Sequence, residues 1–151
     1  MSVGKAGAMH NIVACAGCGR RNRVPVAAGA GVPRCAECHE PLPWLVEADD
    51  AGFAAASAST VPVLVDLWAP WCGPCRMVGP AVEDLARRFA GRVKVLKVNV
   101  DEAPSVAQRF GARSVPTLLV LQGGREVARQ VGALPAAALG RWVEAQLGSA
   151  A

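Results

Sequence analysis

The sequence predicts an α/β fold, in which a mixed central sheet carries helices on both faces and a small cysteine-bearing module precedes it. First, an apolar run at residues 63–68, broken only by Asp66, leads into apolar residues at helical spacing from Met77 to Phe89. Second, after a first short strand and helix, strands and amphipathic helices follow in the order βαβαββα, which is typical of a layered α/β protein. Third, two Cys-x-x-Cys pairs lie in the first 43 residues, where large apolar side chains are few.

The bounds of the predicted strands and helices follow from the spacing of their apolar residues and from residues that typically begin or end such elements. Asp49 or Asp50 can cap the first helix, and Asp101 or Pro104 can open the third. The predicted strands span residues 44–46, 62–69, 93–100, 115–121 and 125–131. The predicted helices span residues 49–58, 72–89, 103–110 and 135–147.

The composition is that of a globular protein. Of 151 residues, 52% are apolar and 19% charged, which suits one domain with a substantial core and a small appendage. The longest apolar runs are too short to span a bilayer. Neither Met1 nor Met9, either of which could be the start, begins a secretory signal, so we expect a cytoplasmic protein without membrane contact. We also expect a monomer.

Four cysteines predict a metal site in the first part of the chain. Cys15 and Cys18 form one knuckle, and Cys35 and Cys38 form a second. Two such knuckles at this separation fit a tetrahedral four-cysteine zinc site of ribbon type, with one structural zinc per chain. The segment between them can bury little, so metal ligation would hold it together. Two disulfides or a pair of extra redox dithiols are the alternatives, and we interpret His39 as a bystander.

The positive charge is concentrated beside these cysteines. Residues 1–43 hold five Lys or Arg against two Glu, whereas residues 44–151 hold eleven against ten acidic residues. The arginines could form a nucleic-acid patch. Because no aromatic residues are interleaved with them, as single-strand binding favours, we interpret them as offsetting the charge of four thiolates. We divide the chain into a flexible N-terminus at 1–11, a zinc-binding module at 12–43 and a main domain at 44–151.

A separate Cys-x-x-Cys lies where the central strand meets the long helix. Cys72 is expected at the helix N-terminus, where unpaired backbone N–H groups and the helix dipole favour an anion. A thiol there loses its proton more easily, and the thiolate is the nucleophile of disulfide exchange. Cys75 lies one turn further on, close enough to form a disulfide with Cys72 and to resolve a mixed disulfide. Gly73 allows the turn, and Pro74 suits the first helical turn because it lacks an N–H.

Asp66 stands in the middle of the apolar strand, six residues before Cys72. If this strand is central, burial raises the pKa of the carboxyl group, which can then exchange protons near neutrality. We therefore expect Asp66 to be the base that deprotonates Cys75 when the mixed disulfide is resolved. The alternative is a solvent-facing Asp on an edge strand.

The run Trp71-Cys72-Gly73-Pro74-Cys75 resembles the active-site motif of the thioredoxin family, and the resemblance extends from about Trp44 to Leu147. The residues before it look like the zinc-bearing N-terminal extension of the thioredoxin-2 subgroup. The resemblance implies a thioredoxin fold, a buried Asp66 with Lys97 as its neighbour, and a Gly-Pro pair of the kind found in reducing members.

The resemblance also assigns residues around the cysteines. It implies a cis bond before Pro116, facing the cysteine pair, although the residues alone favour trans. The backbone at Val115 would then pair with the substrate chain. Trp71, Val115 and Gly132 would form a shallow apolar rim, where Gly132 lets a substrate backbone approach closely.

Together these features predict a protein-disulfide reductase that uses the Cys72/Cys75 dithiol. The resemblance implies electron supply from an NADPH-dependent thioredoxin reductase and oxidised proteins as substrates. One alternative is a thiol oxidase or isomerase in an exported compartment, against which the Gly-Pro pair and the lack of a signal argue. The other is an interaction or redox-sensor module, in which the zinc module binds a partner and the dithiol is the sensor.

Overall fold

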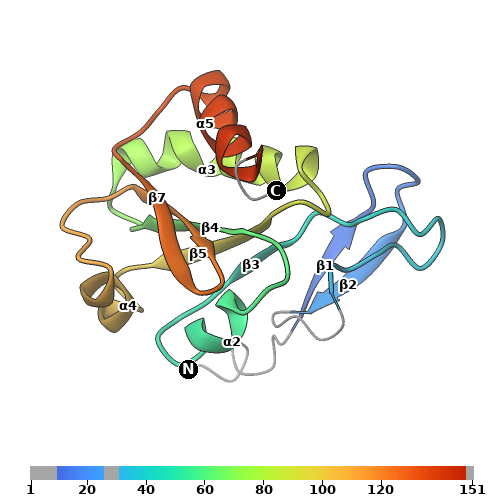
Figure 1. Ribbon diagram of the computed structural model, residues 1–151, viewed down its shortest axis with the longest axis horizontal. Helices are drawn as coiled ribbons and strands as arrows, with labels where there is room; N and C mark the ends of the chain where they lie inside the picture. The colour runs from blue at the N-terminus through green and yellow to red at the C-terminus, as the bar shows by residue number, and fades with distance from the viewer. Residues whose placement is uncertain (1–9, 26–30, 149–151) are drawn as a thin grey trace.

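The computed structural model describes residues 10–25 and 31–148, which form two sheets and four helices (Figure 1). None of these helices is long and apolar enough to cross a bilayer. The strands are β1 (His10–Ala14), β2 (Arg21–Pro25), β3 (Leu45–Glu47), β4 (Val63–Trp68), β5 (Lys94–Asn99), β6 (Thr117–Gln122) and β7 (Arg125–Val131). The helices are α2 (Phe53–Ser57), α3 (Gly73–Arg88), α4 (Pro104–Arg109) and α5 (Ala136–Gly148).

The larger sheet has the strand order β3-β5-β4-β6-β7. Strands β3, β5 and β4 run parallel, whereas β6 is antiparallel to β4 and β7 is antiparallel to β6. The central strand is β4, which pairs with β5 on one side and β6 on the other and is buried from Val63 to Leu67. This arrangement confirms the predicted mixed sheet and its central strand.

Helices cover both faces of this sheet, as predicted (Figure 1). Side chains alternate along each strand, so Leu64 and Val95 pack against α3 and α5, whereas Val65 and Leu96 lie on the face covered by α2 and α4. The turn at Cys72 follows the carboxyl end of β4, which is the end at which α/β sheets usually bind ligands.

The first helix is shorter than predicted. The sequence predicts residues 49–58, whereas α2 contains five residues and has no side-chain cap. The Asp49 carboxylate accepts the Gly52 N–H at 2.9 Å, which makes a turn ahead of the helix. Asp50 bonds to a different helix. The predicted cap by Asp49 or Asp50 is therefore wrong for α2.

The small sheet β1–β2 was not predicted. Its strands pair antiparallel, and Asn22 and Val24 face inward while Arg21 and Arg23 are exposed. The strand signal is weak because the alternation is short and one inward residue is polar. Strand β1 begins at His10, two residues before the expected start of the module, and residues 1–9 of the expected flexible terminus lie outside the described residues.

The cysteine module shares a core with the larger sheet. Cys15 and Cys35 belong to the same buried cluster as the apolar side chains of β4 and β5 that face α2. Trp44 lies where the two parts meet, because its Nε1 donates to the Pro25 carbonyl at 2.9 Å and the Lys94 ammonium lies 4.4 Å from its ring centroid. Unfolding of the module would therefore expose part of the sheet to water.

Candidate functional site

Cys72 is the N-cap of α3. Its Sγ accepts a hydrogen bond from the Cys75 backbone N–H at 3.1 Å, and Pro74 lies in the first turn, where no N–H is needed. The two cysteines are joined in a disulfide, with their Cα atoms 5.3 Å apart. In the reduced protein, the same N–H and the dipole of α3 stabilise a thiolate on Cys72.

The segment before β6 lies against Cys72. The Cys72 Sγ is 3.6 Å from the Val115 carbonyl oxygen, and the Val115–Pro116 peptide bond is cis, as the resemblance implies and the residues alone do not. Gly132 donates its N–H to the Pro116 carbonyl at 2.9 Å. It does so with φ of 91°, a conformation that favours glycine. The structure thus gathers Val115, Pro116 and Gly132 on the side formed by β6 and β7.

An open, mostly apolar cavity of about 240 Å³ lies beside the dithiol. Trp71 is 67% exposed at its wall, and its Nε1 donates to both carboxylate oxygens of Asp101, at 3.3 and 3.1 Å. Trp71 and Val115 were predicted from the sequence, whereas the other lining residues belong to no sequence motif. The lining consists of Trp71, Val100, Ala107, Ala112, Arg113, Ser114 and Val115.

Asp66 is buried in the centre of the sheet, with 1% of its surface exposed. It pairs in the strand register with Lys97 of β5 and Leu118 of β6, so the alternative of an exposed Asp on an edge strand is wrong. Burial raises the pKa of Asp66 to about 6, against the lowering effect of the Lys97 charge. Its Oδ1 accepts no hydrogen bond from any described residue. Such a carboxyl group can take up and release a proton near neutral pH.

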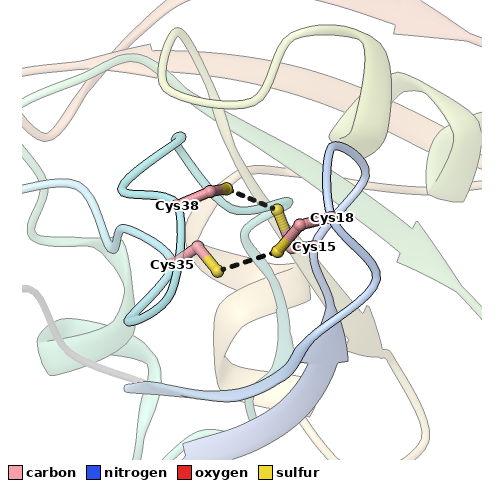
Figure 2. Close-up of side chains that lie close together, drawn as sticks. All are labelled: Cys15, Cys18, Cys35 and Cys38. Carbon is pink, nitrogen blue, oxygen red and sulfur yellow. Dashed lines mark hydrogen bonds between the residues drawn. The ribbon is translucent and has the colours of Figure 1, made fainter.

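The other four cysteines converge from two knuckles of similar shape (Figure 2). In each knuckle the first cysteine donates its N–H to the carbonyl five residues later, at 2.8 Å. All four Sγ atoms lie within 4.8 Å of one another. The pairs Cys15–Cys38 and Cys18–Cys35 have Sγ atoms 3.5 Å apart. Tetrahedral zinc with Zn–S bonds of about 2.3 Å places sulfur atoms about 3.8 Å apart, so the cluster has the size of such a site.

The surroundings of this cluster also fit a metal centre. None of its cysteines is in a disulfide, and His39 is not among the grouped side chains. The Gly17 N–H donates to Cys15 Sγ at 3.3 Å, and the Glu37 N–H donates to Cys35 Sγ at 3.4 Å. Backbone donors of this kind stabilise thiolates, which are the form that binds zinc.

Asn22 is a supporting residue that the sequence analysis missed. Its buried amide donates to Cys35 Sγ at 3.5 Å and to the Arg20 carbonyl at 2.9 Å, while its Oδ1 accepts the Ala36 N–H at 2.9 Å. It therefore ties one knuckle to the other. The sequence feature that could have indicated this role is a polar residue at an inward-facing position of a short strand, because a buried polar side chain needs hydrogen-bond partners.

Four close thiols cannot all ionise without a cation. The Cys38 N–H, with further donors from Glu37 and Asn22, lowers the pKa of Cys35 to about 6. The Glu40 N–H lowers the pKa of Cys38, but burial and the three other sulfur atoms outweigh it and raise that pKa to about 12. A divalent cation would offset this repulsion, so the residues present fit Zn²⁺.

Known proteins are similar in sequence to much of this chain. The family model described as Thioredoxin matches residues 44–145, which contain the dithiol and Asp66 and exclude the four clustered cysteines. Thioredoxin 1 of Nostoc sp. is 54% identical over 89 residues, which are 59% of this chain and 83% of that protein. Thioredoxin of Haemophilus influenzae is 48% identical over 96 residues, covering 63% and 90% of the two chains.

A third relative covers more of the chain. The chloroplastic M-type thioredoxin of Chlamydomonas reinhardtii is 40% identical over 134 residues, which are 85% of this chain and 96% of that protein. These matches agree with the five-stranded mixed sheet and with a Cys-x-x-Cys at the N-terminus of α3. The chain therefore belongs to the thioredoxin family and is a thiol–disulfide oxidoreductase with a thioredoxin fold.

Proposed function

We propose that this chain reduces disulfides in oxidised proteins, with Cys72 as the attacking thiol and Cys75 as the resolving thiol. The observation that carries this role is the position of Cys72 Sγ. It accepts the Cys75 N–H at the start of α3 and lies 3.6 Å from the Val115 carbonyl, beside the open cavity. A nucleophile at this place can reach a disulfide presented on the rim. Gly73 and Pro74 support the reducing direction through their resemblance to reducing members of the family.

The exchange proceeds in two steps. The Cys72 thiolate attacks one sulfur of the substrate disulfide, which forms a mixed disulfide and releases the other substrate sulfur as a thiolate. The Cys75 thiol then loses its proton and attacks Cys72 Sγ. The substrate's second thiolate leaves, and Cys72 and Cys75 form a disulfide. Two electrons pass to the substrate, and reduction of the Cys72–Cys75 disulfide by an external dithiol restores the chain.

Asp66 is the base that we propose for the second step. It lies on the same side of β4 as Leu64, the side that packs against α3, and Cys75 is a buried residue of α3. With its pKa at about 6, Asp66 is largely ionised at neutral pH and can accept the Cys75 thiol proton. Pro116 limits access to the dithiol, and Trp71, Val115 and Gly132 contact the substrate chain in this proposal.

The wider setting of the reaction follows from the same proposal. We propose that an NADPH-dependent thioredoxin reductase resupplies the electrons and that the chain acts in electron transport as a cytoplasmic monomer. The family's general chemistry supports this assignment, since its members are reduced by such enzymes and act on disulfide substrates.

A coupled assay tests the proposed reductase activity. We expect NADPH consumption with thioredoxin reductase and insulin as the disulfide protein, and a fall of at least about a thousandfold in the Cys72→Ser variant, because the nucleophile is lost. The Cys75→Ser variant should still form a mixed disulfide with insulin but should not release it. Unchanged turnover in the Cys72→Ser variant would contradict the role of Cys72.

We also propose that Cys15, Cys18, Cys35 and Cys38 hold one structural zinc ion, as in the thioredoxin-2 subgroup. The size of the sulfur cluster and the N–H donors on Cys15 and Cys35 support it. In this proposal the zinc-binding module is residues 12–43 and the thioredoxin domain is residues 44–151, which share a buried core. When bound, the metal supplies folding energy to a segment with few large apolar residues.

Elemental analysis tests the metal. Protein purified under reducing conditions is expected to carry about one zinc ion per chain, because four thiolates complete a tetrahedral site. The Cys18→Ser variant, which removes the exposed ligand, should carry less zinc than wild type after dialysis against a chelator. Metal-free wild-type protein would reject this site, whereas two intramolecular disulfides detected by mass spectrometry would favour the disulfide alternative.

A further inference from the structure

Helix α4 depends on a residue from a distant part of the chain for its cap. It spans six residues, its N-cap is Ala103, and no side chain near the helix start caps it. Pro104 has no N–H, so the first helical N–H groups that need acceptors are those of Ser105 and Val106. The Asp50 carboxylate accepts both, Oδ2 from Ser105 at 3.1 Å and Oδ1 from Val106 at 3.0 Å.

The adjacent residues Asp49 and Asp50 accept hydrogen bonds from different parts of the chain. Asp49 accepts the Gly52 N–H at 2.9 Å and so acts within its own turn. Asp50 lies in the connection between β3 and α2, 55 residues before Ser105. Its two oxygens stabilise the N-terminus of α4 by two hydrogen bonds and by a negative charge at the positive end of the helix dipole.

Helix α4 carries one wall of the cavity beside the dithiol. Ala107 lines the cavity, and its carbonyl accepts the N–H of Ala112, another lining residue, at 2.9 Å. The chain continues through the lining residues to Val115, whose carbonyl lies 3.6 Å from Cys72 Sγ. The position of α4 therefore decides the shape of the surface next to the attacking sulfur.

Other contacts hold the far end of α4. The ring of Phe110 meets that of Phe53 edge-on with centroids 5.8 Å apart, and the Arg129 guanidinium donates to the Phe110 carbonyl. At the capped end Ala103 and Val106 are buried in the core, so loss of the Asp50 carboxylate would remove the two capping bonds and loosen that end while the other stays in place. The consequence is a cavity wall with a less well-defined position in a chain that remains folded.

We propose that Asp50 is a positioning residue for the recognition of protein substrates. By capping α4 it holds the wall formed by Ala107 and Ala112 where a substrate chain bound at the dithiol would meet it. This proposal rests on the proposed reductase function. A protein substrate needs the surface around Cys72, whereas a small disulfide needs only access to the sulfur atom, so the two kinds of substrate respond differently.

Steady-state kinetics separate these responses. Insulin serves as the protein disulfide and dithiobis(nitrobenzoic acid) as the small disulfide, with wild type, Asp50→Ala, Asp50→Asn and Asp49→Ala compared. For Asp50→Ala we expect KM for insulin to rise by about three- to tenfold with kcat within about twofold, and little change with the small disulfide. Asp50→Asn keeps an oxygen that can accept a hydrogen bond but carries no charge, so its KM for insulin should lie between those of wild type and Asp50→Ala. Asp49→Ala has the same change of charge and should behave as wild type.

Hydrogen exchange supplies a readout that does not depend on activity. In Asp50→Ala the amides of Ser105 and Val106 should exchange at least about tenfold faster, while the amides of α3 keep their protection. Equal KM values for insulin, or the same loss on both substrates or in Asp49→Ala, would overturn the role of Asp50. Wild type that reduces the small disulfide but not insulin would instead contradict the proposed protein-disulfide reductase function, and this role with it.

Discussion

Replacing Cys35 with Ser is expected to abolish binding of the proposed zinc ion and to lower the free energy of unfolding of the whole chain by more than about 4 kcal/mol. Cys35 is 1% exposed and belongs to the buried cluster that includes the α2-facing side of β4 and β5. If this cluster holds zinc as proposed, the loss of one thiolate ligand would remove the metal's contribution to folding. Because the core is shared, the module cannot unfold without exposing Trp44 and part of the sheet.

Denaturant unfolding of wild type, Cys35→Ser and Ala36→Ser measures this effect. Ala36 is exposed on the same knuckle. Its backbone N–H donates to the Asn22 side-chain oxygen, a bond that a change of side chain at Ala36 leaves in place, so Ala36→Ser should unfold like wild type. A strong chelator added to wild type should shift its midpoint toward that of Cys35→Ser. Two separate transitions, of which the second is the same in all variants, would show that the module and the sheet unfold independently.

Asp66→Asn is expected to change how the stability of the oxidised protein depends on pH. Below the ordinary pKa of 3.8, Asp66 is protonated in both the folded and the unfolded chain. Between 3.8 and the folded-state pKa of about 6, the unfolded chain loses this proton first, so the free energy of unfolding of wild type falls as the pH rises. This pKa shift lowers the free energy of unfolding of wild type by about 3 kcal/mol, and the full loss is reached above pH ~7.

The test is the difference in unfolding free energy between Asp66→Asn and wild type at about pH 3 and about pH 8. Relative to wild type, Asp66→Asn should be more stable at the higher pH than at the lower pH by about 3 kcal/mol. The constant cost of burying an amide cancels in the comparison. Asp84→Asn, an exposed change on α3, should follow wild type at both values. A difference that does not vary with pH would contradict the raised pKa.

The same variant tests the proposed role of Asp66 in resolving the mixed disulfide. We expect Asp66→Asn to slow turnover by about tenfold or more, because the Cys75 thiol loses its base, while Cys72 forms the mixed disulfide at nearly the wild-type rate. Rapid quenching with alkylating agent, followed by mass spectrometry, should show the mixed disulfide accumulating. Equal slowing of both steps would refute the assignment of Asp66 to the second step.

The sequence by itself determined the central sheet and the dithiol turn. Strand β4 and helix α3 lie within one or two residues of their predicted ends, because their apolar periods and the Gly-Pro pair are local signals. An Asp in an otherwise apolar strand indicates burial, and Asp66 is buried. The spacing of four cysteines predicted their convergence for the same reason, since each knuckle is a short local turn.

Only the tertiary structure decided how these parts meet. Asp50 is a plausible cap for the helix that follows it, yet its partners are two N–H groups some 55 residues away. The cavity wall includes Ala107 and Ala112, whose side chains carry no chemical signal. Trp44 joins the cysteine module to the sheet through a backbone carbonyl of β2. Local patterns specify elements and turns, whereas the contacts between distant segments exist only after the chain has packed, so no window of sequence contains them.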